Sequence, residues 1–217
     1  MRITPQIIIL LQSLKGFGNA TVRGIVNKLS ACETCSLSLL YELIGEMVAS
    51  KALRVQLPTI EDLKKAQEYA ESIVLKSDNE GVKMLTFLDP EFPKRFHKTV
   101  SETGKSDIPL IIHCKGNLSI LDASALTIIG TREPNNDGMR AAEYFSSEFA
   151  KNGINIVSGL ALGCDTIAHR GALSVGGATT AILAGGLDAI YPKENLLLAE
   201  SIYNQEVFLY QRTRLRH

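Results

Sequence analysis

The sequence predicts an α/β fold with a mostly parallel sheet, preceded by a small all-α domain. Two observations carry this prediction. After residue 124, short apolar runs alternate with segments of helical length, which is typical of βαβ units. Before residue 81, apolar residues instead recur at the three- and four-residue spacing of amphipathic helices. We therefore expect a helical domain over residues 1–80 and an α/β domain over residues 81–217.

In the N-terminal part, three apolar series and one start signal predict four helices. The series are Ile8-Leu11-Leu14, Val22-Ile25-Val26-Leu29 and Leu39-Leu43-Met47. Pro58 and Thr59, followed by two acidic residues, are typical of a helix start, and this helix should continue toward Leu75.

The turn between the first two predicted helices fits a helix-hairpin-helix pattern. Its Gly-Phe-Gly sequence would expose backbone N–H groups to a nucleic-acid phosphate without reading the bases. Lys15, Gly16 and Gly18 are the candidate contacts, and residues 1–60 carry six Lys and Arg against three Asp and Glu. Packing of two helices and nothing else remains the alternative for such a turn.

The α/β part is predicted from its apolar runs. Residues 81–124 are rich in Gly and Pro but contain one plausible buried strand, 109–114. Three further strands are expected at 125–129, 154–157 and 179–183, with helices at 138–151 and 165–174. Such a rhythm indicates a parallel sheet with helical crossovers.

Composition excludes several classes of protein. The 217 residues are 45% hydrophobic, and 23 Lys and Arg balance 23 Asp and Glu. This excludes a disordered chain and a protein that coats nucleic acid through bulk positive charge. No apolar stretch reaches eighteen residues, so we expect no membrane span and a cytoplasmic location. Cys32 and Cys35 form a lone CxxC pair, so reduced cysteines are expected and no metal or cofactor.

Each of the three later strands ends in a glycine-bearing loop. The loops are 129–134, which contains Arg132, then 157–165, and then 184–188 with Tyr191 and Pro192 close behind. In a doubly wound sheet such loops meet at the carboxyl ends of the strands, where glycine lets the backbone approach an anion. Arg132 would add a bidentate phosphate donor. We predict a phosphate-bearing ligand, and the alternative is that the glycines only turn tight corners.

The same loops lack the signatures of common enzymes. There is no G-x-G-x-x-G, no P-loop and no G-x-S-x-G, which disfavours a dinucleotide site, a P-loop ATPase and a serine hydrolase. Asp165 and His169 have no nucleophile nearby. We interpret Asp165 as a helix N-cap and His169 as its neighbour in a network that braces the loop, with a metal site as the lesser alternative. The protein is therefore not predicted to be an enzyme.

Residues 83–203 closely resemble the DNA-processing protein A family, DprA/Smf. The matching motifs are Gly130-Thr131-Arg132 with Gly138, the run from Ser158 to Leu173, and Gly186 with Tyr191-Pro192 and Asn195. The resemblance implies a Rossmann-like domain after a SAM-like helical domain. It also implies a non-enzymatic, homodimeric protein that binds single-stranded DNA in natural transformation (competence) and DNA recombination, protects it, and helps load the RecA recombinase.

The resemblance also implies a binding site. Arg132 matches the family's DNA-contacting arginine, with Gly130, Thr131 and Gly138 as the adjoining phosphate cradle. The second and third loops extend the predicted DNA site. The residues of this extension are Ser158, Gly159, Gly163, Asp165, Gly185, Gly186 and Lys193. For Tyr191 we prefer a buried packing role over a stacking platform for bases.

The sequence departs from the family pattern at three places. Leu162 stands where many relatives have a basic residue, and Cys164 where Ile is common, so affinity for phosphate should be reduced. After residue 202 the chain reads NQEVFLYQRTRLRH, with Arg212, Arg214 and Arg216 near its end, so we expect a C-terminally truncated product with an incomplete sheet. The alternatives are a nucleotide-derived ligand sensor or phosphoribohydrolase of a related fold, or a relic that binds nothing.

Overall fold

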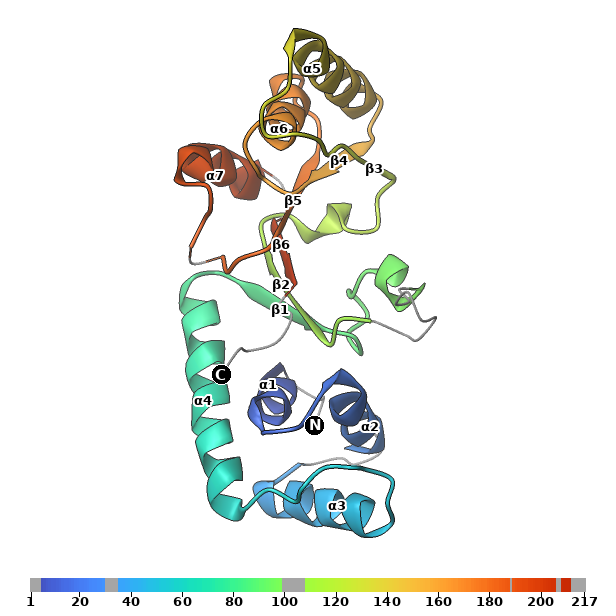
Figure 1. Ribbon diagram of the computed structural model, residues 1–217, viewed down its shortest axis with the longest axis vertical. Coiled ribbons are helices and arrows are strands. Elements are labelled where there is room, and N and C mark those ends of the chain that lie inside the picture. The colour runs from blue at the N-terminus through green and yellow to red at the C-terminus, as the bar shows by residue number, and fades with distance from the viewer. Residues whose placement is uncertain (1–4, 30–34, 99–107, 188, 206–207, 212–217) are drawn as a thin grey trace. The chain divides into compact units, whose positions relative to one another are not determined.

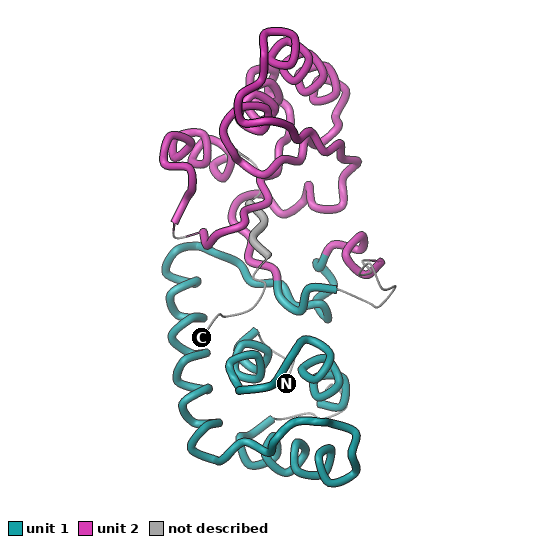
Figure 2. Tube along the Cα trace, in the orientation of Figure 1, with its two compact units in different colours: residues 1–92, 107–111, 213–217 teal, residues 93–106, 112–212 magenta. Residues whose placement is uncertain are grey.

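The computed structural model describes residues 5–29, 35–98, 108–187, 189–205 and 208–211, and for residues 205 and 208–211 only the backbone. It divides into two compact units (Figure 2). The first comprises residues 1–92, 107–111 and 213–217, and the second comprises residues 93–106 and 112–212. Each unit is described by itself.

The first unit contains the four predicted helices and one strand (Figure 1). The elements are α1 (Pro5–Ser13), α2 (Asn19–Leu29), α3 (Leu37–Ala49), α4 (Ile60–Asn79) and β1 (Lys83–Thr86). The start predicted for the last helix is confirmed, because Thr59 and Asp62 form a reciprocal capping box. Hydrogen bonds from the side chain and backbone of Thr59 lower the pKa of the Asp62 carboxyl below its usual 3.8.

The core of the first unit is built from the apolar faces predicted for α1 and α2, whereas on α3 the buried residues are Leu40, Ile44 and Met47 and not the predicted Leu39 and Leu43. Its fully buried side chains come from all four helices and include Ile8, Leu11, Ile25, Leu40, Ile44 and Leu63. Arg23 of α2 contacts two residues of the first unit that lie outside its helices, Ile108 and Phe87. Its Nη2 donates to the carbonyl of Ile108 at 2.7 Å, and its guanidinium lies 5.8 Å from the ring centroid of Phe87. Arg23 therefore links a helix to the segment around β1.

The second unit is built on a mostly parallel sheet, as predicted. Its strand order is β2-β6-β5-β4-β3. The strands are β2 (Ile111–Lys115), β3 (Ala125–Thr127), β4 (Asn155–Ser158), β5 (Thr179–Leu183) and β6 (Phe208–Gln211). The pairs β3–β4, β4–β5 and β5–β6 are parallel, and β2–β6 is antiparallel.

Three helices pack on one face of the parallel strands: α5 (Asn136–Lys151), α6 (Cys164–Ser174) and α7 (Leu196–Gln205). Register pairing places Leu126 and Ile156 on the same face, and these residues pack with Ala150 of α5 and Ala168 of α6. Ala181 of β5 packs in a second cluster with residues of α7. The helices thus lie over the strands that they connect, which is the arrangement of consecutive right-handed βαβ units in an α/β fold.

Three elements were not predicted: β1, α7 and β6. The strand β6 lies in the tail that we expected to diverge from the family pattern. Its backbone nevertheless pairs with β5 on one side and β2 on the other. A four-residue apolar strand has no periodicity that distinguishes it from a loop, so only its long-range pairing reveals it.

The cysteines and the arginines near the C-terminus are only partly within the described residues. Cys32 and the three arginines at 212, 214 and 216 lie outside the described residues. Cys35, Cys114 and Cys164 are free thiols. In the described part of the chain, no cluster of three or more His, Cys, Asp or Glu side chains could hold a metal ion. Among the same residues, no helix combines the length and the apolar character needed to cross a bilayer.

Candidate functional site

The three glycine-bearing loops meet at one pocket in the second unit. The pocket has a volume of about 170 Å³. Arg132 lines it from the first loop, the second loop supplies Gly159, Ala161 and Leu162, and the third side is formed by residues 183–186, Ala189, Tyr191 and Pro192. The pocket therefore lies at the carboxyl ends of parallel strands, where ligands of open α/β sheets bind.

Arg132 is the charged side chain among the described residues that line this pocket. Its side chain is exposed, and in the described part of the chain its guanidinium has no hydrogen-bond or ion-pair partner. Hydrogen bonds after Arg132 hold the loop that carries it. Thr131 Oγ1 accepts a bond from the N–H of Glu133 at 3.2 Å, and Asn135 caps α5. This hydrogen-bonded loop thus presents the unpaired guanidinium of Arg132, with its several N–H donors, at the mouth of the pocket.

Gly163 holds the first and second loops in contact. Its φ of +77° is in the region that favours glycine. A methyl group at this position would clash with the carbonyl oxygen of Thr131 and would lie 2.5 Å from the carbonyl carbon and oxygen of Arg132. The N–H of Cys164 also donates to the Thr131 carbonyl at 3.1 Å. The backbone that positions Arg132 therefore rests directly on the start of α6.

Asp165 braces the second loop from inside. The side chain is buried, and its Oδ2 accepts bonds from the N–H groups of Gly159 at 3.1 Å and Ala161 at 3.3 Å. The predicted bracing role is confirmed, but the predicted N-cap is wrong. Gly163 occupies the N-cap position, and Asp165 is the second residue of α6. The helix begins earlier because its positive-φ glycine makes the turn that a capping side chain makes elsewhere.

His169 takes part in a different contact from the one predicted. It is fully buried, and its Nδ1 lies 2.7 Å from Thr179 Oγ1 on β5, not beside Asp165. The Thr179 hydroxyl donates its proton to the carbonyl of Ile156 at 2.8 Å, so Nδ1 must be the donor to Thr179. Nε2 is then unprotonated, and it has no partner among the described residues. Burial lowers the pKa of His169 to about 4.

This histidine should make the stability depend on pH. Because the folded-state pKa lies below the ordinary 6.5, the unfolded chain binds more protons in mildly acidic solution. Stability should therefore fall as the pH drops from 6.5 toward 4. We expect a loss of about 2 kcal/mol between pH 7.5 and pH 5 in denaturant unfolding. The variant His169→Gln should be less stable than the wild-type protein at pH 7.5, and its free energy of unfolding should fall by about 2 kcal/mol less between pH 7.5 and pH 5. Equal losses in both proteins would contradict the assignment.

Asn195 is a site residue that the sequence reasoning matched only as part of a motif. Its side chain is buried, and Nδ2 donates to the carbonyl of Leu160 at 2.9 Å and to Thr166 Oγ1 at 2.8 Å. A longer contact of 3.3 Å reaches the carbonyl of Ala161. Asn195 thereby ties the segment after the third loop to the second loop. An Asn at this position after Tyr-Pro was the available signal, but its partners lie about thirty residues away in the chain.

Several predicted contact residues have structural partners instead of an open polar group. Ser158 Oγ donates to the carbonyl of Ile128 at 2.7 Å, and the N–H of Gly138 donates to Asn135 Oδ1 at 2.8 Å. Gly130 lies against Cys164, where a methyl group would come within 2.6 Å of its sulfur. Lys193 is exposed, in a short 3-10 turn beside the pocket-lining Pro192. Of the third-loop predictions, Gly185 and Gly186 do line the pocket.

Tyr191 is exposed, contrary to the packing role that we preferred. Its relative exposure is 76%, and it is one of the residues that line the pocket. The peptide bond to Pro192 is cis. An aromatic ring with this exposure contributes little to the core, so the buried interpretation is wrong.

The predicted second contact lies in the first unit. Helices α1 and α2 flank the turn, and Phe17 is buried between Gly16 and Gly18. A Cβ atom built on either glycine would have open space around it, so both face outward. Lys15 is exposed and lines an open groove together with Thr59, Asp62 and Lys65. A Gly-Phe-Gly turn therefore joins α1 and α2, and its phosphate contact stays a prediction.

Fold and site together define a Rossmann-like protein whose glycine loops and one arginine surround a small pocket at the sheet edge. Comparison with known families agrees with this description. Residues 83–214 match the family described as DNA recombination-mediator protein A, and the chain belongs to that family. The match extends through residues 204–214, so the expectation that the resemblance ends near residue 203 is wrong.

Curated relatives carry the names DprA and Smf. DNA processing protein DprA of Streptococcus pneumoniae is 39% identical over 103 residues, which are 48% of this chain and 36% of that protein. DprA of Bacillus subtilis is 35% identical over 104 residues, 48% of this chain and 35% of that protein. Protein Smf of Escherichia coli is 36% identical over 100 residues, 46% and 27% of the two chains. The chain thus matches about a third of the length of these relatives, and the two DprA proteins among them are named for DNA processing.

Two solved structures are similar to this one. DNA processing protein A of Streptococcus pneumoniae superposes with a TM-score of 0.72 at 25% identity, covering 98% of this chain and 69% of that chain. The Helicobacter pylori protein gives a TM-score of 0.51 at 32% identity, covering 61% and 56% of the chains. The study of the latter concerns a single-stranded DNA binding mode of DNA processing protein A. The Rossmann-like fold class is confirmed by these similarities.

Proposed function

We propose that this protein binds single-stranded DNA at the pocket formed by the three glycine loops, with Arg132 as the phosphate contact. The observation that carries this proposal is the unpaired Arg132 guanidinium at the mouth of a pocket with otherwise uncharged described residues. The family membership and the Helicobacter pylori relative support the ligand class. Because the chain is neutral overall, binding depends on this placed group and not on bulk charge.

The three loops divide the work in this proposal. Gly130, Thr131 and Gly163 fix the backbone beside Arg132, while Gly185 and Gly186 let a ligand approach the opposite side of the pocket. Asp165 and Ser158 do not contact the ligand in this proposal but stabilise the conformation of the second loop through their hydrogen bonds. A groove with a cation and an exposed aromatic ring suits strands of any sequence.

The variant Arg132→Ala tests the proposal directly. A charge-assisted bond contributes about 1.5–3 kcal/mol, so we expect single-stranded DNA to bind roughly 10- to 100-fold more weakly. The slope of log affinity against log salt should also fall by about 0.7, the value for one phosphate contact on a single strand. Fluorescence anisotropy with a labelled oligonucleotide at several salt concentrations measures both quantities.

Arg170→Ala is the matched control, because this exposed arginine of α6 does not line the pocket and its removal changes the net charge equally. Unchanged affinity in Arg132→Ala, or equal losses in both variants, would rule out the assigned contact. Mononucleotides provide a further arm. If they bind as tightly as the oligonucleotide, the protein is a nucleotide-ligand sensor instead.

The finer parts of the role follow from the family resemblance. We propose that strand binding serves recombination and natural transformation, and that assistance to RecA and formation of a homodimer belong to the whole family protein. The helical domain of residues 1–80 is proposed to add a second, sequence-independent phosphate contact through Lys15 and the backbone at Gly16 and Gly18. The protein is proposed to act in the cytoplasm.

A further inference from the structure

A short basic segment precedes β2 in the chain, well before the three glycine loops. It is the 3-10 helix η1 (Lys94–Lys98), with the sequence KRFHK, and we call these five residues the basic turn. Lys94, Arg95, His97 and Lys98 are all exposed, and Phe96 is half-buried. The basic turn therefore concentrates positive charge locally in a chain whose charges balance overall.

The basic turn is held by residues that come just before β3. The backbone N–H of Lys94 donates to Asp122 Oδ1 at 3.1 Å, and the guanidinium of Arg95 donates through Nη2 to the carbonyl of Ala123. A guanidinium has five N–H donors, so this bond leaves others for a ligand. Because both contacts join residues 28 positions apart in the chain, they place the basic turn at the amino end of β3.

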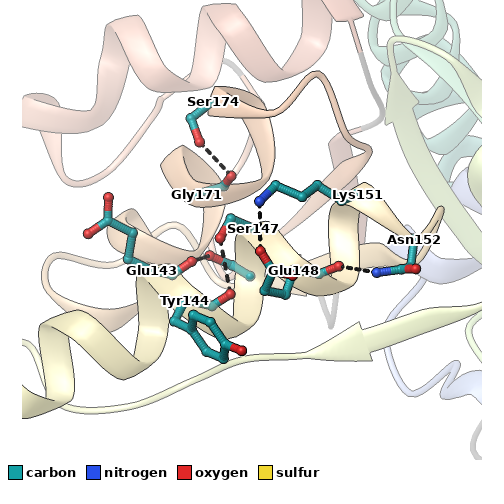
Figure 3. A network of polar contacts seen from close by, with 9 residues as sticks. Glu143, Tyr144, Ser147, Glu148, Lys151, Asn152, Gly171 and Ser174 are labelled. Carbon is teal, nitrogen blue, oxygen red and sulfur yellow. Dashed lines mark hydrogen bonds and ion pairs between the residues drawn. The ribbon is translucent and has the colours of Figure 1, made fainter.

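The cations of the basic turn are not neutralised as a cation of α5 is. On α5, the ammonium of Lys151 lies 2.6 Å from the carboxylate of Glu148 (Figure 3). In the described part of the chain, the two lysines of the basic turn and Arg95 form no such ion pair. Asp122 contacts the turn, but its carboxylate bonds to a backbone N–H. Three positive charges against one negative charge suit an anionic polymer.

The basic turn and Arg132 lie at the two ends of β3. Ala123, which the turn contacts, comes two residues before this strand, and Arg132 comes five residues after it. Nine residues of extended chain span about 32 Å at most. Residues 124–131 carry no charged side chain, and among the described strands β3 pairs with β4 alone. No negative charge of this segment therefore interrupts the edge between the two sites.

We propose that the basic turn is a second phosphate-binding site for the DNA strand that binds at Arg132. The strand runs along the uncharged edge of β3, with phosphates at Lys94 and Lys98 at one end and at Arg132 at the other. Arg95 and His97 add N–H donors. A stacked strand advances about 3.4 Å per nucleotide, so about nine nucleotides at most connect the two sites. The inference rests on the proposed strand binding at Arg132 and defines the length of DNA that one chain contacts.

Strands of different length test the second site. The double variant Lys94→Ala/Lys98→Ala removes two cations and keeps Arg95, whose bond to Ala123 holds the turn. With a strand of about 20 nucleotides, we expect binding about 3- to 30-fold weaker and a slope of log affinity against log salt lower by about 1.4, since two phosphate contacts are lost. A strand of about four nucleotides covers about 14 Å when stacked, so it should lose less than about twofold. Fluorescence anisotropy at several salt concentrations measures both strands.

Arg140→Ala/Arg170→Ala is the matched control, because these exposed arginines of α5 and α6 belong to neither site and their loss changes the net charge equally. Equal losses in the two double variants, or equal losses with short and long strands, would overturn the inference. Tighter binding of a duplex than of the single strand through these lysines would also overturn it. If Arg132→Ala has no effect, the proposed function itself fails. If Arg132→Ala weakens binding and the lysine variant does not, the second site alone is wrong.

Discussion

Replacing Gly163 with alanine is expected to destabilise the second unit by about 3–5 kcal/mol. Two effects add at this position. The positive φ of +77° is costly for a residue with a side chain, and the new methyl group would meet the backbone of Thr131 and Arg132. Backbone atoms cannot rotate away as a side chain does. Denaturant unfolding measures the loss, and any folded fraction should bind single-stranded DNA more weakly because Arg132 is displaced.

Gly176→Ala is the matched control for that experiment. Gly176 also has a positive φ, of +68°, but a methyl group there would have no atom within 4 Å. Only the conformational cost remains, so we expect a loss of about 1 kcal/mol and normal DNA binding. Equal losses at the two glycines would show that the contact between the first and second loops contributes nothing.

Replacing Asn195 with alanine should cost about 3 kcal/mol. The amide group satisfies the buried carbonyl of Leu160 and contacts Thr166, and its removal leaves these acceptors without a donor. Asn195→Asp should be at least as harmful, since it keeps the shape but places a carboxylate against carbonyl oxygens. Thermal or denaturant unfolding of both variants measures the effect.

Asn117→Ala provides the comparison for Asn195. The side chain of Asn117 also forms a hydrogen bond, but it is exposed. It accepts a bond from the N–H of Ser119 at 3.1 Å at the start of a short turn. We expect a loss of about 1 kcal/mol or less. If Asn195→Ala costs no more than Asn117→Ala, the second loop does not depend on the buried amide.

Elements with strong local signals could be predicted from the sequence. The Thr59 start of α4 is a local capping pattern, and residues 179–183 form the predicted strand with the same limits. The strand β6 was not predicted, because it is defined by partners far away in the chain. Helix α7 was not predicted either, and the side chain of Asn195 just before it bonds to Leu160 and Thr166. Local patterns thus predicted α1 to α6 and the strands β2 to β5, whereas β6 depends on tertiary pairing.

The candidate site shows the same division. The glycine loops and Arg132 were predicted because βα corners with glycine and a cation are recognisable locally. The contact that fixes Gly163 against Thr131 and the partner of His169 on β5 were not, since each depends on how two strands align. The exposure of Tyr191 was also missed, because an aromatic residue flanked by apolar neighbours has no sequence signal for its solvent-facing side.

The position of β6 has a consequence for how the second unit folds. Ile112 on β2 pairs with Gln211 on β6. The contact that joins β2 to the parallel strands is therefore between residues about 100 positions apart in the chain. During synthesis, β2 leaves the ribosome long before its neighbour exists. The parallel strands β3, β4 and β5 can assemble early, but the sheet becomes continuous only when residues 208–211 enter between β5 and β2. Until then, β2 is an apolar strand without its β6 partner in the nascent chain, and this is the stage at which chaperones would have most to protect.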